Sequence, residues 1–124
     1  MYSIVDLEAT GGKFNEESII EIAIYKYDGE KVVDQFISLV NPDKEISPYV
    51  EKLTGIDAKM VKTAPVFSEL AKRIIEITDS TILVAHNAQF DYRLLQIEFD
   101  RLGYEYIKES LCTVILSQKL LPNQ

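Results

Sequence analysis

Hydrophobic and polar residues alternate along the first forty positions of the chain. This alternation predicts three strands, over residues 4–10, 18–27 and 31–40. Ile20, Ile22 and Ile24 are predicted to share one face of the second strand. Asp28-Gly29 is a two-residue hairpin signal between the second and third strands. Connections this short predict an antiparallel meander.

The pattern changes to helical spacing after Asn41-Pro42. Ser47-Pro48 is typical of an N-cap and first helical residue, and Gly55 is expected to end this short helix. Asp57 can cap another brief helical turn. Two longer amphipathic helices are then predicted from apolar residues at Phe67, Leu70, Ala71, Ile74, Ile75 and Ile77, and at Phe90, Leu94, Ile97 and Leu102.

Two further strands and a closing helix complete the predicted order. Thr81–Ala85 is a continuous apolar run, which indicates a strand covered on both faces, and 106–112 is the last predicted strand. Thr113 can cap a helix that Pro122 ends. Strands that alternate with helices after a hairpin-rich start predict an α/β fold with a mixed sheet and helices on its faces.

Composition limits the classes of protein that this chain can represent. At 124 residues, with 47% hydrophobic residues, it fits a single domain over residues 1–124. A formal charge of −7 argues against a broad basic surface for bulk nucleic-acid binding. Cys112 is the one cysteine, which favours a packed thiol in a reducing compartment, and no apolar run reaches membrane-spanning length. We therefore predict a soluble, cytoplasmic protein without a membrane partner.

Three acidic residues are candidates for chemistry. Side chains alternate across a strand, so Asp6 and Glu8 lie on the same face. On this spacing alone, solvated acids at an exposed strand end are the more frequent explanation. Two features favour a site: the strand runs into Thr10-Gly11-Gly12, and Asp91 follows the predicted strand at 81–85 in the opening turns of a helix. Carboxylates that converge in this way suit Mg²⁺ or Mn²⁺.

Five ordered motifs carry a resemblance to a known family over nearly the whole chain. They are Val5-Asp6-Leu7-Glu8-Ala9-Thr10-Gly11, Ile20-Glu21-Ile22-Ala23, Leu39-Val40-Asn41-Pro42, Leu53-Thr54-Gly55-Ile56 and Val84-Ala85-His86-Asn87-Ala88-Gln89-Phe90-Asp91. In order and spacing they resemble the DEDD exonucleases of the histidine subtype. The chain looks most similar to the proofreading epsilon subunit of bacterial DNA polymerase III and its stand-alone relatives.

The resemblance implies an RNase H-like fold and a 3′–5′ exonuclease that uses two Mg²⁺ or Mn²⁺ ions. By analogy, Asp6 would bridge both ions, Glu8 would hold the ion that activates water, and Asp91 would help to hold the second. The implied substrate-binding residues are Thr10, Leu53, Asn87 and Phe90, with Leu53 as a wedge against bases. Core packing explains Phe90 equally well. The implied partners are a single-stranded or frayed 3′ end and a DNA polymerase subunit.

The chain departs from the family pattern at its third motif. A histidine followed five positions later by a fourth acid does not occur, and the one histidine, His86, belongs to the second motif and is interpreted as a supporting residue. We therefore expect a shortened chain with little or no nuclease activity, and an apolar surface that could pair two copies. A natural short form, an RNA-directed relative and a catalytically inactive binding module for nucleic acid or polymerase remain alternatives.

Overall fold

The fold is built on one mixed sheet, seen in a computed structural model that describes residues 1–13 and 16–112. The strands are β1 Tyr2–Ala9, β2 Ile19–Tyr27, β3 Val32–Leu39, β4 Ile82–Ala85 and β5 Ser110–Cys112. They lie in the order β3-β2-β1-β4-β5, so β1 is the central strand. It pairs antiparallel with β2 and parallel with β4. The predicted meander and mixed sheet are confirmed.

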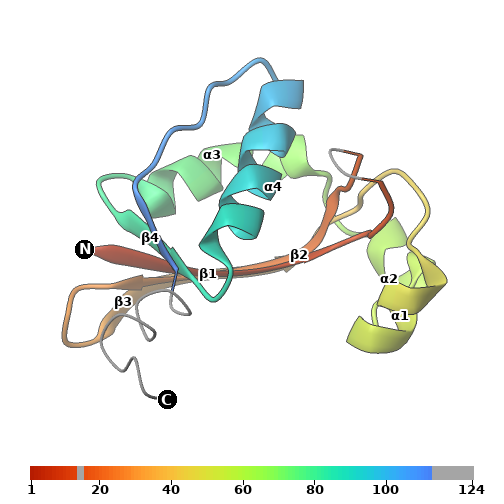
Figure 1. Cartoon of the computed structure of the whole chain (residues 1–124), viewed down its shortest axis with the longest axis horizontal. Helices are drawn as coiled ribbons and strands as arrows, with labels where there is room; N and C mark the ends of the chain where they lie inside the picture. The colour runs from red at the N-terminus through yellow and green to blue at the C-terminus, as the bar shows by residue number, and fades with distance from the viewer. Residues whose placement is uncertain (14–15, 113–124) are drawn as a thin grey trace.

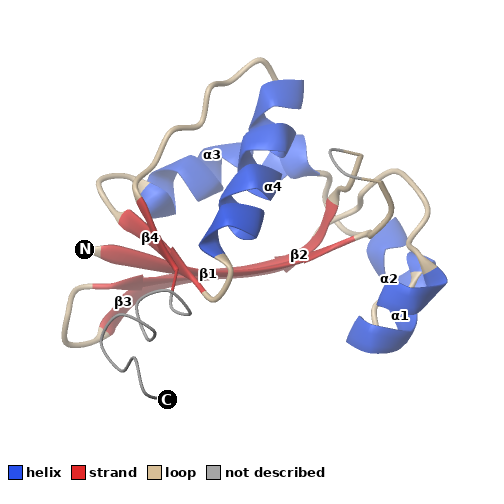
Figure 2. Cartoon of the chain, viewed as in Figure 1, coloured by secondary structure: helices blue, strands red, loops and turns tan. Residues whose placement is uncertain are grey.

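The two longer helices cover one face of this sheet. α3 Phe67–Thr78 and α4 Ala88–Arg101 both lie above the sheet in Figure 1. The two shorter helices, α1 Pro48–Thr54 and α2 Ala58–Lys62, lie beyond the end of the sheet at which β1 stops. Figure 2 shows the same separation between the helical layer and the short helical pair.

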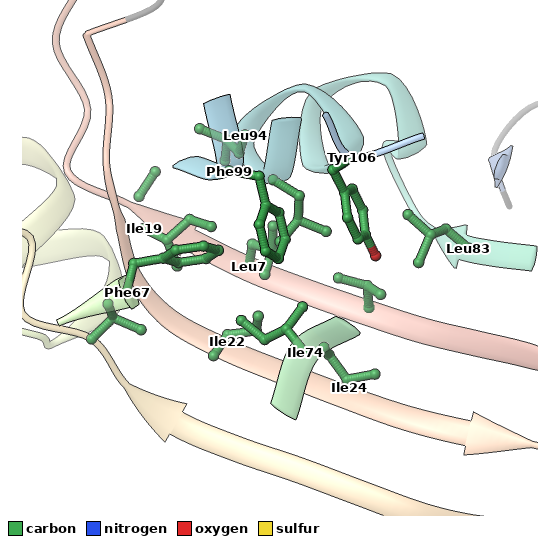
Figure 3. Packing of buried hydrophobic residues seen from close by; sticks show 14 of the residues in the cluster. Leu7, Ile19, Ile22, Ile24, Phe67, Ile74, Leu83, Leu94, Phe99 and Tyr106 are labelled. Atoms are coloured by element: carbon green, nitrogen blue, oxygen red, sulfur yellow. The ribbon is translucent and has the colours of Figure 1, made fainter. Parts of the chain in front are cut away.

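The main core lies between the sheet and the two longer helices. Val5, Leu7 and Ala9 are the inward residues of β1, and they alternate with the more exposed Ile4, Asp6 and Glu8. The other labelled members of this cluster in Figure 3 are Ile19, Ile22, Ile24, Phe67, Ile74, Leu83, Leu94, Phe99 and Tyr106. The rings of Phe99 and Tyr106 stack with centroids 4.6 Å apart. Since Phe99 is fully buried, its truncation would cost about 3–5 kcal/mol.

A β-bulge between β1 and β2 corrects one sequence expectation. The register shifts between Glu8 and Ala9, so that Ala9 pairs with Ile19 and Ile20 is left as the extra residue. Ile22 and Ile24 enter the main core, whereas Ile20 packs into a second cluster with Ile46, Ile56 and Val61. The three isoleucines are all buried, but the prediction that they share one face was wrong.

Other differences from the predicted elements are local. Residues 28–31 form the hairpin loop, which is longer than the predicted two-residue turn because the side chain of Asp28 accepts from the backbone N–H groups of Glu30 and Lys31. β5 begins only at Ser110, since Tyr106 turns into the core and its hydroxyl bonds the Thr78 hydroxyl.

The strand at 82–85 is covered less evenly than predicted. In β4, Leu83 and Ala85 are buried, whereas Ile82 and Val84 are only half-buried. The described helices α3 and α4 pack on one face of the sheet, which explains this difference. The predicted closing helix, from Thr113 to Pro122, lies outside the described residues. Within the described part of the chain, no helix has the length and apolar character needed to cross a membrane.

The predicted boundaries of the short helices are confirmed. α1 follows Ser47 as its N-cap residue with proline at its first position, and it ends at Gly55 in the left-handed conformation. Asp57 caps α2 by accepting a hydrogen bond from the backbone N–H of Met60. The starts and ends of these two helices depend only on residues next to them in the chain, so the sequence alone suffices to predict them.

Gly11 joins the end of β1 to α1 through a close contact. An added Cβ at Gly11 would lie 2.8 Å from Cγ2 of Val50 and 3.2 Å from Cβ of Ser47, at a φ of +75°. At Gly12, φ is +104° but an added Cβ would meet nothing within 4 Å. Gly12 therefore offers a matched control for backbone strain without the contact.

We predict that Gly11→Ala lowers the free energy of unfolding more than Gly12→Ala does. Both variants bear the cost of a left-handed alanine, and Gly11→Ala adds overpacking of about 1–3 kcal/mol. Urea denaturation of the two variants measures the difference. Equal losses at the two positions would contradict close packing of α1 on the end of β1.

Candidate functional site

Two of the candidate acids lie side by side on the central strand. Asp6 and Glu8 alternate with Val5 and Leu7, which face the core below α3 and α4. The carboxylates therefore emerge on the opposite face of the sheet. Asp6 is exposed and Glu8 is half-buried. The structure thus confirms that the two acids share a face.

A further acid, Glu21, was missed as a member of this cluster by sequence reasoning. It pairs directly with Glu8 across β1 and β2, so both side chains lie on the same face. Burial raises the pKa of Glu8, and the negative charges of Asp6 and Glu21 raise it further. Only the register of the β1–β2 hairpin reveals this neighbour, because the two glutamates are distant in sequence.

The third candidate, Asp91, comes from the first turn of α4. Its backbone N–H bonds the carbonyl oxygen of Asn87, the residue before the helix. Burial raises the pKa of Asp91 to about 7, and the charges of Asp6 and Glu8 add to the effect. The three predicted carboxylates are therefore close enough to repel one another, although Asp91 is distant from the other two in sequence.

An ion pair at the other end of α4 holds this helix against the hairpin. Oε2 of Glu98 accepts from the backbone N–H of Ile19 at 3.0 Å, next to the β-bulge. Oε1 of Glu98 accepts from Arg101 at 3.0 Å, and Arg101 also donates to the Ser18 hydroxyl at 2.9 Å. Burial raises the pKa of Glu98, while Ile19 and Arg101 oppose this shift. Glu98 follows Asp91 by two helical turns, so the same face of α4 carries both residues.

The predicted substrate-binding residues lie in different environments. Thr10 is buried, and its hydroxyl accepts from the backbone N–H of Ser18 at 3.2 Å, which gives it a structural role. Phe90 packs against the main core with Arg93 5.4 Å from its ring centroid. Leu53 is 69% exposed and Asn87 is also exposed. Contact of these four residues with a substrate stays a prediction.

The distances among Asp6, Glu8 and Asp91 decide whether these three acids can hold a metal ion in the arrangement seen. Across residues 1–13 and 16–112, no three aspartate, glutamate, histidine or cysteine side chains converge closely enough, as they stand, to surround an ion. Asp91 nevertheless has a raised pKa through burial and two acidic neighbours. Several negative charges close together repel one another, and a hard divalent cation bound between them removes this repulsion. Asp6, Glu8 and Asp91 carry carboxylate oxygens, which are the ligand type that Mg²⁺ and Mn²⁺ prefer.

A cavity of the described residues lies elsewhere. It has a volume of about 840 Å³, and its lining includes Gly11, Lys44, Phe67, Glu98 and Arg101. Asp6, Glu8 and Asp91 are not among the lining residues. Since Glu98 and Arg101 already bond each other and the hairpin, they serve packing there. The three candidate acids therefore lie outside this cavity.

Solved structures share this architecture. Exonuclease X, in complex with 5′ overhanging duplex DNA, superposes with a TM-score of 0.79 at 32% identity, over 99% of this chain and 66% of that one. Exonuclease I of E. coli, in complex with a 5cy-dT13 oligonucleotide, gives a TM-score of 0.84 at 18% identity, over 98% of this chain and 30% of that one. The latter likeness concerns the fold alone. The sheet, the helices and the likeness to exonuclease X define an RNase H-like protein of the DEDD exonuclease superfamily.

Sequence comparisons give the family. The RNase_T family model, described as "Exonuclease", matches residues 3–124. The PolC-type DNA polymerase III of Caldanaerobacter subterraneus subsp. tengcongensis is 39% identical over 119 residues, which are 96% of this chain and 8% of the polymerase. The 3′-5′ exonuclease DinG of Staphylococcus saprophyticus subsp. saprophyticus is 35% identical over 105 residues, 85% of this chain and 12% of that protein. The chain belongs to the RNase_T exonuclease family, and it spans about a tenth of these curated relatives.

We predict that Asp91 makes stability fall as the pH rises in the absence of metal. The folded protein holds the Asp91 proton up to about pH 7, whereas an unfolded chain releases it near pH 4. Between these values the folded state binds more protons, so the free energy of unfolding decreases with pH. Asp91→Asn should flatten this decrease, and at pH 8 it should be more stable than wild type by about 1 kcal/mol or more.

Urea denaturation in EDTA between pH 4 and pH 8 measures the effect. Asp100→Asn is the matched control, since Asp100 is exposed on the same helix. Its stability should follow the wild-type pH dependence. Parallel curves for wild type and Asp91→Asn would contradict a shared electrostatic environment for the three acids.

Proposed function

We propose that the chain is a metal-dependent 3′–5′ exonuclease domain that removes nucleotides from the 3′ end of a DNA strand. The observation that carries the proposal is the acidic cluster of Asp6, Glu8 and Asp91, where burial and two acidic neighbours raise the pKa of Asp91 to about 7. A structural role does not require three acids that destabilise one another. Membership of the RNase_T exonuclease family supports the same reading.

Asp6, Glu8 and Asp91 are the residues that would hold the cations. Bound divalent ions supply charge stabilisation for the attacking and leaving oxygens and lower the pKa of a bound water. Asp6 and Glu8 lie on either side of the core-facing Leu7 along β1, and the charges of both act on Asp91 of α4. Because ligands must be deprotonated, Asp91 has to release its proton before it can act in this role. Activity should therefore rise with pH toward neutrality.

The one histidine of the sequence is a supporting residue in this proposal. His86 is the single histidine of the sequence, and it lies exposed between β4 and α4. It forms part of the second motif, so we propose that it supports Asn87 and Asp91 rather than deprotonating water. On this proposal the 124-residue chain alone hydrolyses DNA slowly.

DNA is the proposed substrate because two of the similar proteins act on DNA or are bound to it. One relative is a DNA polymerase III of the PolC type, and one similar structure is an exonuclease bound to duplex DNA with a 5′ overhang. The net charge of −7 gives this chain little general attraction to phosphates. We therefore propose that a polymerase subunit supplies part of the grip on the strand.

The chain should release mononucleotides from a 3′-tailed DNA in Mn²⁺, slowly but above background. Asp6→Asn should reduce this rate by at least about a hundredfold, because residues of one catalytic unit act together. Gel and chromatographic assays of 5′-labelled DNA, with a matched RNA as a second arm, measure the products. Asp34→Asn, a change of an acid on β3 that pairs with Arg73, is the control and should keep the wild-type rate.

Different outcomes separate the alternatives. Faster hydrolysis of RNA than of DNA would favour an RNA-directed exonuclease. Equal release by wild type and Asp6→Asn would contradict the proposed site. No release from either strand by a folded, metal-binding chain would favour an inactive binding module.

Divalent cations should stabilise the protein through the same acids. Binding to the folded state alone adds RT ln(1 + [L]/Kd), about 2.7 kcal/mol at a concentration one hundred times the Kd. Thermal denaturation with and without Mn²⁺ should show this gain for wild type and for Asp34→Asn, and a much smaller gain for Asp91→Asn. An equal gain in all three proteins would place the bound ion outside the acidic cluster.

A further inference from the structure

α1 carries two large apolar side chains on its surface. Tyr49 is 72% exposed and Leu53 is 69% exposed, and none of the residues of α1 is buried. They are four positions apart, so they lie one turn apart on the same side of the helix, about 6 Å along its axis. Among the described residues, neither side chain belongs to either hydrophobic cluster. Packing among the residues that the structure describes therefore does not account for them.

α1 is fixed to the strand that carries the acids. The backbone N–H of Ser47, which precedes α1, bonds the carbonyl oxygen of Thr10 at 2.9 Å. Val50 lies against Gly11, where an added Cβ would come within 2.8 Å of its Cγ2. The exposed pair on α1 therefore keeps a fixed position relative to Asp6 and Glu8, which lie on the strand ending just before Thr10.

The same helix lies on the side of the sheet where the acids emerge. In Figure 1, α3 and α4 lie above the sheet and α1 lies below the level at which β1 ends. Asp6 and Glu8 point away from the core that α3 and α4 cover. A strand whose end lies at the acids can therefore reach α1 without crossing the layer of α3 and α4.

The charges around α1 differ from those of the whole chain. Lys52, Lys59 and Lys62 are all exposed on α1 and α2, against two acids, Glu51 and Asp57. Positive charges thus outnumber negative ones here, although the chain as a whole carries a formal charge of −7. Asp43, Lys44 and Glu45 precede α1, and residues 43–62 are neutral in sum, so they repel a polyanion less than the average of the chain does.

We propose that Tyr49, together with Leu53, forms a platform on which unpaired bases of the substrate strand stack. This inference rests on the proposed function and adds Tyr49 as a substrate-contacting residue. An aromatic ring stacks on any base because every base has a flat π-face, and such contacts do not depend on attraction to phosphate. Stacking is therefore a suitable source of affinity for an acidic protein. The occupant is a single strand with its 3′ end at the acids.

Binding of an unpaired oligonucleotide tests the platform without hydrolysis. Fluorescence anisotropy of 5′-labelled dT8 in Ca²⁺ should give about tenfold weaker binding for Tyr49→Ala, as expected for one lost base–aromatic stack. Tyr49→Trp should bind at least as tightly as wild type, since it restores the ring. Ile107→Ala is the control, because Ile107 is an equally exposed apolar residue, at 68%, on a loop remote from α1 in sequence.

A set of dT8 strands, each with one abasic position, identifies the partner base. At one position, removal of the base should weaken binding to wild type about tenfold and leave binding to Tyr49→Ala unchanged. Equal binding by wild type and Tyr49→Ala, or equal sensitivity of both to every abasic position, would overturn the platform alone. Absence of binding by wild type would overturn the proposed function as well.

Discussion

The alternation of side chains along β1 is the constraint on which the structure and its site both depend. This central strand sends Val5, Leu7 and Ala9 into the core and leaves Asp6 and Glu8 on the other face. A shift by one residue would exchange the two sets and bury the carboxylates below α3 and α4. Burial of the apolar set thus fixes the direction of the acids. The same interaction that stabilises the sheet sets the position of the two candidate acids.

α4 connects this strand to the rest of the candidate site. Leu94, Leu95 and Phe99 are fully buried against the sheet, and the ion pair of Glu98 with Arg101 holds the helix to the β-bulge. These contacts keep Asp91 near Asp6 and Glu8, where burial raises its pKa to about 7 and the charges of the two acids add to the shift. The folding energy of α4 therefore maintains a cluster that is unfavourable by itself. A bound cation would relieve this cost.

Local signals in the sequence predicted much of the fold. The strand alternation, the Ser47-Pro48 start of α1, the Gly55 stop and the Asp57 cap depend on neighbouring residues, and the structure confirms each of them. The bond from Ile19 to Glu98 joins residues 79 positions apart, and the bulge depends on how Ala9 pairs with Ile19 on the next strand, so no local pattern reveals either. The same limit applies to Glu21, whose place beside Glu8 follows from strand register. Asp6, Glu8 and Asp91 were found because alternation and motif order both point to them.

The central claim is that these three carboxylates form one cation site. The most direct measurement is a crystal structure of the chain soaked in Mn²⁺, with the ion located by its anomalous scattering. The account predicts a peak within about 2.5 Å of carboxylate oxygens from Asp6, Glu8 and Asp91, with the side chains drawn together around it. A peak bound elsewhere, or no peak between these acids at saturating Mn²⁺, would contradict it.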